Sequence, residues 1–182
     1  MDSKLVTTAQ RGDREAFTVL AAALTPPFLS VSHRILRDLA QAEDATQQAL
    51  LIVWQRLPQL RDPDRFEAWA YRLLVRACYA EGERSRRWTS RLQLLPSNDG
   101  MAADALSGVI DRDQLERAFA RLSLEQRTVV VLRHYRHMSL DQVSSVLEIP
   151  VGTVASRLHY ALRQMRSALE ADARPVYRRA SQ

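Results

Sequence analysis

The chain has 182 residues, of which 46% are hydrophobic, with a formal net charge of +5 and a pI near 10.0. This length is enough to bury one good core or two small ones, and the composition excludes a disordered chain or a fibre. The basic excess favours a polyanionic partner. A single cysteine, Cys78, excludes an internal disulfide and a cysteine-based zinc site, and it fits a reducing compartment.

The first 36 residues predict packed helices. Apolar residues on either side of Gly12 indicate a helical pair, with Asp13 as the N-cap of its second member. The uncharged run 16–33 is long enough to resemble a membrane span, but Pro26 and Pro27 divide it, so we expect two packed segments and no membrane insertion. No basic and apolar signal peptide precedes this run, which predicts a cytoplasmic protein.

The next predicted helix, about residues 42–57, is apolar on two faces. Ala45, Ala49 and Val53 fall on one face, whereas Leu51 and Trp54 stand among acidic and amide residues on another. A helix with two contact faces has two neighbours. Either both neighbours belong to the same domain, or the second face docks a partner protein.

A polar loop at 59–65 leads into a long predicted helix, about residues 63–86. Phe66, Leu73 and Leu74 belong to its buried stripe. The far side carries a basic face composed of Arg65, Arg72, Arg76, Tyr79, Arg86 and Arg87. Arginines interleaved with an exposed tyrosine, with Trp88 just beyond, suit single-stranded nucleic acid, because guanidinium groups follow phosphates and aromatic rings stack on bases. A solvated helix surface is the alternative.

The composition predicts four segments. Residues 93–110 contain no basic residue and little periodicity, and we interpret them as a linker. It separates a helical domain at 1–92 from a second one at 111–172. Residues 173–182 form a basic tail, which we expect to fray and to assist DNA binding nonspecifically.

The second domain contains a predicted helix-turn-helix at 139–166. Ser123 with Gln126 caps an earlier helix of this domain. Ser139 and Gln142 form a capping box for the first helix of the motif, and Glu148 and Pro150 mark the turn. The predicted core face of the second helix consists of Val154, Leu158, Ala161, Leu162, Met165 and Leu169. Its opposite side carries hydroxyl, imidazole and guanidinium groups suited to a major groove. An ordinary helical hairpin with a solvated face is the alternative.

The sequence contains no recognisable catalytic constellation. It lacks a glycine-rich phosphate loop, a His-Glu-x-x-His motif and a nucleophile elbow. His134 and His137 lack companions for a metal site. Asp38, Glu43 and Asp44 would be candidates in a magnesium-dependent nuclease, but a helix N-terminus attracts acidic residues anyway. We therefore predict a protein that is not an enzyme and needs no metal or cofactor.

Several runs together resemble the extracytoplasmic-function (ECF) sigma factors of bacterial RNA polymerase. The runs are AQRGDREAF, AEDATQQALLIVWQRL, FEAWAYRLL and the long stretch from LSLEQRTVVV to LRQMR, in the family's order and spacing. The resemblance implies an all-α fold of two small helical domains joined by a flexible linker, the C-terminal one containing a helix-turn-helix. It also implies a factor that binds core RNA polymerase, duplex −35 DNA and single-stranded −10 DNA, and an anti-sigma factor as regulator.

The resemblance assigns three sets of site residues. Those implied to bind core polymerase are Asp44, Gln47, Gln48, Leu51 and Gln55. Those implied to bind the melted −10 strand are Arg61, Arg65, Arg72, Arg76, Tyr79 and Arg86. Those implied to read the −35 duplex are Thr153, Ser156, Arg157, His159, Tyr160 and Arg163. The alternative function is a stand-alone helix-turn-helix regulator that binds DNA without polymerase.

Four positions depart from the family's pattern. Gln48 stands where glutamate is usual, Arg76 where asparagine is common, and Ala80 where aspartate is common. Promoter specificity is therefore not transferable from relatives. Glu148 occupies the turn position usually held by glycine, where a left-handed backbone would cost roughly 1–2 kcal/mol.

Overall fold

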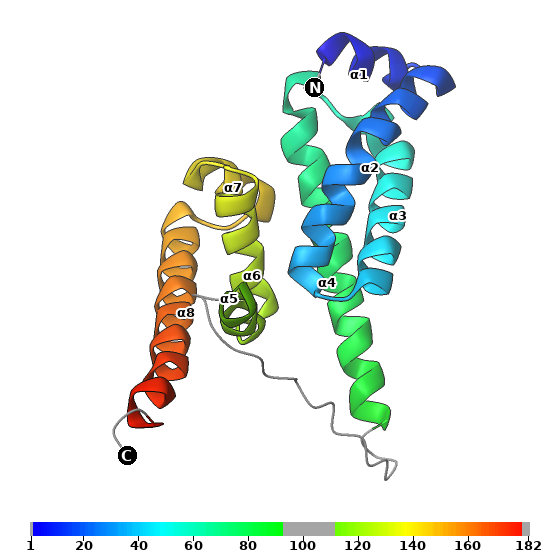
Figure 1. Ribbon diagram of the computed structural model, residues 1–182. Helices are drawn as coiled ribbons and strands as arrows, with labels where there is room; N and C mark the ends of the chain where they lie inside the picture. Colours follow the sequence, from blue (N-terminus) through cyan, green and yellow to red (C-terminus); the bar gives the residue numbers. More distant parts are fainter. Residues whose placement is uncertain (1, 93–111, 180–182) are drawn as a thin grey trace.

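The computed structural model describes residues 2–92 and 112–179, with side chains for 2–88 and 113–171 (Figure 1). Every regular element within these ranges is a helix, which confirms the all-α prediction. The helices gather into two groups, one on either side of residues 93–111, as expected for two small domains. The predicted linker at 93–110 lies outside the described residues.

The N-terminal domain is built from four α-helices. These are α1 (Ser3–Gln10), α2 (Arg14–Leu36), α3 (Leu39–Arg56) and α4 (Phe66–Leu92). Two short 3₁₀ turns, η1 (Leu57–Gln59) and η2 (Pro63–Arg65), connect α3 to α4. Helix α3 packs against both α2 and α4. Asp13 caps α2 by accepting a hydrogen bond from the Ala16 N–H at 2.9 Å, as the sequence predicted.

The expectation that Pro26 and Pro27 divide the second helix was wrong. Helix α2 runs without a break through both prolines, although each one removes a backbone donor. Its apolar face supplies much of the domain core, including Leu20, Phe28 and Ile35, so tertiary packing outweighs the local cost. By length and composition α2 also passes as a membrane span, but these side chains pack inside the helical domain.

The C-terminal domain holds the helix-turn-helix. Its elements are α5 (Arg112–Ala120), α6 (Leu124–Val130), the π-turn η3 (Val131–Tyr135), α7 (Leu140–Leu147) and α8 (Val151–Arg179). Both predicted capping boxes are present, Ser123 with Gln126 on α6 and Ser139 with Gln142 on α7. Helix α8 extends to Arg179, into the stretch where the sequence predicted a basic tail.

One position of the predicted α8 core was wrong. Leu162 is 43% exposed, and Ala168 is buried instead. The buried positions Val154, Ala161 and Ala168 recur every seven residues. This spacing gives a narrow line of contact with the neighbouring helices, whereas the sequence predicted a broader stripe.

The two domains contact each other. Helix α7 lies against α4, and α6 and η3 lie against α2. The approach is close at Gly82 on α4, where an added Cβ would come within 2.9 Å of Leu124 Cδ2. Polar contacts across the interface connect Arg72 to Glu148 and Arg136 to Glu67. The free chain therefore adopts a closed arrangement with its helix-turn-helix on the N-terminal domain.

Candidate polymerase and promoter-DNA interfaces

The outer face of α3 is open to solvent. Leu51 is 55% exposed, and the polar residues predicted around it, namely Asp44, Gln47, Gln48 and Gln55, are exposed as well. Trp54 is partly held by Phe17, whose ring centroid lies 4.5 Å away. An exposed leucine beside a tryptophan and several amides makes a rigid, mixed apolar and polar surface of the kind that proteins use for docking.

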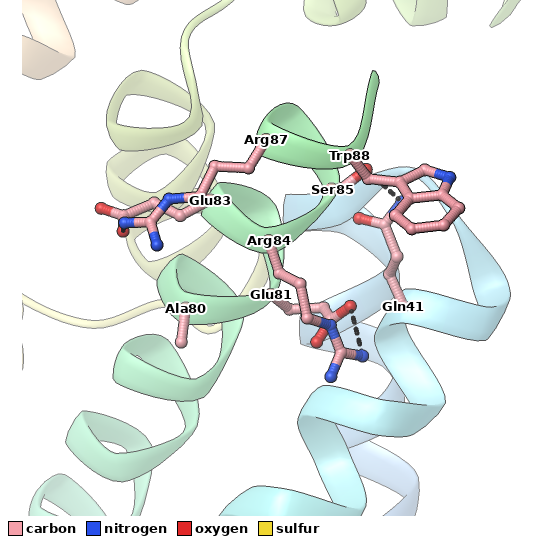
Figure 2. A pocket seen from close by; sticks show the side chains of 8 residues that line it. All are labelled: Gln41, Ala80, Glu81, Glu83, Arg84, Ser85, Arg87 and Trp88. Atoms are coloured by element: carbon pink, nitrogen blue, oxygen red, sulfur yellow. Dashed lines mark hydrogen bonds and ion pairs between the residues drawn. The ribbon is translucent and has the colours of Figure 1, made fainter. Parts of the chain in front are cut away.

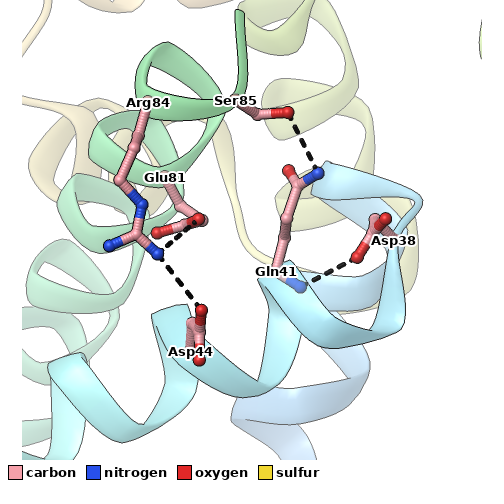
Figure 3. A network of polar contacts seen from close by, with 6 residues as sticks. All are labelled: Asp38, Gln41, Asp44, Glu81, Arg84 and Ser85. Carbon is pink, nitrogen blue, oxygen red and sulfur yellow. Dashed lines mark hydrogen bonds and ion pairs between the residues drawn. The ribbon is translucent and has the colours of Figure 1, made fainter. Parts of the chain in front are cut away.

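Asp44 already has a partner at the edge of this face. Arg84 Nη2 on α4 lies 3.2 Å from Asp44 Oδ2 and 3.0 Å from Glu81 Oε1 (Figure 3). Beside this ion pair, Gln41 Nε2 donates to Ser85 Oγ at 3.2 Å. These contacts join the first half of α3 to the second half of α4. The sequence analysis did not identify Arg84, because no local pattern connects residues so far apart.

A hollow of about 710 Å³ opens between these two helix halves (Figure 2). Trp88 stands at its rim and is 65% exposed, whereas Glu81 and Glu83 contribute carboxylates to its walls. Arg84 and Arg87 also line the hollow, so two guanidinium groups balance the two carboxylates and the lining has no excess positive charge for a phosphate. Arg87 is paired with Glu83 at 3.5 Å on the same helix.

The 59–65 loop is held in place by α1. Gln10 Nε2 donates to the Leu57 carbonyl at 3.1 Å and to the Leu60 carbonyl at 2.6 Å. Arg61 and Arg65, both predicted to contact the −10 strand, are exposed beside this anchor. Sequence reasoning missed Gln10, because its role depends on carbonyl groups about 50 positions further along the chain.

The basic face of α4 is partly covered, which corrects the expectation of an open surface. Arg72 Nη1 donates to Glu148 Oε1 at 2.8 Å, and Arg72 Nη2 donates to the Ser145 carbonyl at 2.9 Å. Arg76 forms an ion pair with the other carboxylate oxygen of Glu148. Arg86 remains exposed. The structure thus brings Arg72 and Arg76 together, but around a glutamate of the second domain.

Tyr79 is half-buried instead of exposed. Burial raises the pKa of its hydroxyl above the ordinary value, and the charges of Glu125 and Arg157 reach it from the C-terminal domain. Burial also acts to raise the pKa of Glu125, but its own backbone amide, the Ser123 hydroxyl, Arg86 and Arg157 hold that pKa below the ordinary range. Arg157, predicted to read DNA, therefore lies near the domain interface in this arrangement.

The rest of the predicted α8 recognition face is accessible. Ser156, His159, Tyr160 and Arg163 are exposed, and Thr153 is half-buried. Ser156 Oγ donates to the Thr153 carbonyl at 3.0 Å, and the Arg163 guanidinium lies 5.7 Å from the Tyr160 ring centroid. A guanidinium, a phenol and an imidazole on one exposed helical face have the donors and acceptors needed for base edges and phosphates.

The turn between α7 and α8 keeps the left-handed backbone. Glu148 has φ 56° and ψ 40°, and its N–H donates to the Ser144 carbonyl. Ser144 Oγ in turn donates to the Ile149 carbonyl at 2.6 Å. Local hydrogen bonds therefore hold a glutamate in a conformation that favours glycine.

The described part of the chain has neither a cluster of metal ligands nor an exposed thiol. Within this part, no group of three His, Cys, Asp or Glu residues is placed to hold a metal ion. Cys78 is buried in the N-terminal domain, where burial raises the pKa of its thiol to about 11 and its Sγ donates to Ser32 Oγ at 3.4 Å. Cys78 therefore has the environment of a packing residue.

A helix-turn-helix domain joined in one chain to a helical domain with an arginine-rich face defines a two-domain DNA-binding protein. The chain matches the family models Sigma-70 region 2 at residues 20–89 and Sigma-70, region 4 at residues 112–165. It is 34% identical over 141 residues to the ECF RNA polymerase sigma factor SigL of Mycobacterium tuberculosis, covering 75% of this chain and 79% of that protein. The chain belongs to the ECF sigma factors of RNA polymerase.

Other related proteins match a larger part of the chain. The RNA polymerase sigma-H factor of Pseudomonas aeruginosa is 27% identical over 187 residues, which cover 93% of this chain and 94% of that protein. The fold is similar to CnrH, solved in complex with the cytosolic domain of CnrY, with a TM-score of 0.68, 22% identity and coverage of 94% and 98% of the two chains. It is also similar to the sigma factor RpoE of Bartonella quintana, solved with the anti-sigma factor NepR, with a TM-score of 0.67 and 19% identity.

Proposed function

We propose that this sigma factor uses three separate surfaces during transcription initiation. The outer face of α3 docks on core RNA polymerase, the 59–65 loop and the basic face of α4 capture the melted −10 strand, and α8 reads the −35 duplex. The observation that carries the proposal is the exposed Leu51 on α3, because in the described chain this apolar face has no intramolecular cover.

The proposed docking surface is rigid and combines an apolar centre with a polar rim. Helix α3 is fixed on its inner side by Ala45, Ala49 and Val53, all buried, so its outer residues are presented on a fixed framework. Leu51 supplies the apolar centre and Gln47, Gln48 and Gln55 supply a polar rim. Gln48 makes the rim less acidic than a glutamate would. The attraction to a basic docking partner is therefore weaker.

The strand-capturing surface combines positive charge with a positioned loop. Arg61 and Arg65 on the loop, and Arg72, Arg76 and Arg86 along α4, would follow the phosphates of one strand. Tyr79 would stack on a base once the second domain moves off it. Ala80 carries no hydrogen-bonding group, so direct base readout there is absent and Arg76 takes on more of the contact.

The duplex-reading surface is the exposed side of α8. His159, Tyr160 and Arg163 project from the helix that follows the turn, with Thr153 and Ser156 near its start and Arg157 on its flank. A recognition helix of this type enters the major groove with its first turns and grips phosphates with its flanking groups. This division leaves catalysis to the polymerase, and the protein would act in the cytoplasm without a cofactor.

Regulation by an anti-sigma factor is part of the proposal. The similar structures were solved as CnrH with the cytosolic domain of CnrY and as RpoE with NepR. We expect this chain to be held in the same general way, by a protein that covers the polymerase-binding or DNA-binding surfaces. A pull-down from cells that recovers only polymerase subunits, in both resting and stressed cultures, would count against this part.

The test of the proposed function combines association and transcription. Purified protein added to core polymerase should direct run-off transcripts from a specific start on genomic template. The double variant L51A/Q47A should lose co-purification with core polymerase, whereas V19A, at a residue of α2 that is 54% exposed, should keep it. Transcription that is not stimulated on any genomic template, or polymerase binding that survives L51A/Q47A, would favour the stand-alone regulator.

A further inference from the structure

One proposed DNA-binding surface of this chain, on α4, is covered by the second domain in the closed arrangement. Arg72 and Arg76 stand one helical turn apart on α4, on the side predicted to hold the −10 strand. The turn of the helix-turn-helix lies directly against them, and both arginines pair with its Glu148. A surface meant for a nucleic-acid strand is therefore occupied by part of the same protein.

The carboxylate of Glu148 has the position and chemistry of a bound phosphate. Its two oxygens are shared between two guanidinium groups, with Arg72 Nη1 at 2.8 Å from Oε1 and Arg76 Nη2 against Oε2. Arginine binds carboxylates and phosphates through the same fork of N–H donors. Arg72 also donates to the Ser145 carbonyl at 2.9 Å, so its orientation is fixed from two sides.

Other contacts hold the domains in the same register. Arg136 Nη2 donates to Glu67 Oε1 at 3.2 Å, and its guanidinium lies 5.0 Å from the Tyr71 ring centroid. Ser30 and Tyr135 share a hydrogen bond of 2.5 Å between their hydroxyl oxygens. These contacts are partly exposed polar interactions that are weak one by one, and they add to the apolar packing of α6 against α2 and α4.

The closed arrangement excludes simultaneous promoter contacts. Promoter elements centred near −10 and −35 are about 25 base pairs apart, which is about 85 Å of B-form DNA at 3.4 Å per pair. A chain whose −10 surface touches its own helix-turn-helix cannot span that distance. Arg72 and Arg76 also cannot hold the phosphates of a DNA strand while both pair with Glu148.

We propose that Glu148 occupies a phosphate-binding site formed by Arg72 and Arg76, and that it masks this site in the free protein. The inference rests on the proposed strand-capturing role of α4. The left-handed backbone at Glu148 is one that glycine adopts more easily, so glutamate gives up local stability at the turn while adding two ion pairs between the domains. Binding to polymerase, and then to the DNA strand, would replace the carboxylate with a phosphate.

The first measurement concerns the shape of the free protein. In small-angle X-ray scattering we expect E148Q and E148G to increase the radius of gyration by about 2–4 Å as the domains separate. The control E170Q removes one negative charge from exposed Glu170 on α8 and should leave the radius unchanged. Glycine suits the left-handed turn, so E148G tests the masking without endangering the fold of the helix-turn-helix.

The second measurement concerns the masked site. The probe is a fluorescein-labelled single strand of mixed sequence, about 15 nucleotides long. We expect E148Q and E148G to bind it about three- to tenfold more tightly than the wild type, because the binding-competent fraction rises. E170Q should change binding by less than about twofold. In the E148G background, R72Q/R76Q should weaken binding again.

A charge exchange distinguishes a direct pairing from a general loss of charge. E148R alone should open the protein, and E148R/R72E/R76E should close it again, as measured by the radius of gyration. If neither E148Q nor E148G changes the radius or the strand affinity, the masking is overturned, even if R72Q/R76Q weakens strand binding and the role of α4 stands. If Glu148 variants open the protein but R72Q/R76Q does not weaken strand binding in E148G, the closure is supported and the strand-capturing role of α4 is overturned.

Discussion

The outer face of α3 and the basic face of α4 belong to the same small domain but differ in availability. Leu51 on α3 is open to solvent, whereas Arg72 and Arg76 on α4 are paired with Glu148 and Tyr79 lies under the second domain. A surface that is open in the free protein can bind its partner directly. A covered surface can bind only after the second domain has moved away. If the two surfaces have the proposed roles, the difference predicts that polymerase docking precedes strand capture.

The largest effect is expected at the open surface. L51R places a charge at the apolar centre of the docking face, and we expect the affinity for core polymerase to fall by about 50-fold. Because Leu51 is exposed, the free energy of unfolding should change by no more than about 0.5 kcal/mol. Binding measured by fluorescence anisotropy with labelled core polymerase tests this, with V19R as the matched control. A loss shared by both variants would show that charge, and not the site, is responsible.

The next effect concerns the covered surface. R72Q/R76Q removes two phosphate contacts and both ion pairs to Glu148. We expect about a tenfold loss in run-off transcription, together with a shallower dependence of strand affinity on salt, by about 1.4 in the logarithmic slope for two contacts to a single strand. Polymerase binding should be unchanged, since α3 is untouched. A double variant that binds DNA with the wild-type salt slope would contradict the assignment.

Acidification should weaken the start of α6, where the Glu125 carboxylate accepts hydrogen bonds from its own backbone amide and from Ser123. The pKa of Glu125 is held below its ordinary value of 4.5 in the folded protein, so its ionised form stabilises the fold above that pH. That contribution is lost as the pH falls below about 4.5 and through the lowered pKa. Thermal unfolding followed by circular dichroism from pH 6 to pH 3.5 should show a smaller loss in E125Q than in the wild type. Equal losses of thermal stability in the two proteins would show that Glu125 does not contribute to the acid sensitivity.

The smallest effect is expected from R84A at the edge of the open surface. Losing Arg84 frees Asp44 from an exposed ion pair, which contributes little stability, and removes a partner of Glu81, whose side chain is 13% exposed. If Asp44 faces a basic site on polymerase, its release should tighten docking by about two- to threefold, measured in the same anisotropy assay. The variant R87A, which leaves Asp44 paired, serves as the control. Weaker docking by R84A would mean that Arg84 itself contacts polymerase.

Local signals in the sequence predicted most of the fold. Asp13, Ser123 and Ser139 cap the helices that they were expected to cap, because an N-cap depends on groups within three residues. Helix α2 was predicted in two pieces, because the cost of Pro26 and Pro27 is local while the packing that outweighs it comes from α3 and α4.

The surfaces were harder to predict than the elements. Periodicity placed Leu51 and Arg72 on the correct faces, but it carries no information about what covers a face. The contact of Glu148 with Arg72 joins residues 76 positions apart. The same limitation hid the pairing of Gln10 with the 59–65 loop and of Arg84 with Asp44.

The anchor provided by Gln10 has a practical consequence for handling the protein. The two carbonyl groups that it binds, those of Leu57 and Leu60, lie in η1 and in the adjoining 59–65 loop proposed to capture the −10 strand, so the short α1 supports a loop that begins nearly 50 residues later. A tag or fusion that pulls on the N-terminus would therefore loosen the loop before it disturbs the core. Such a fusion protein should keep the wild-type melting temperature and affinity for polymerase, but it should produce fewer open promoters.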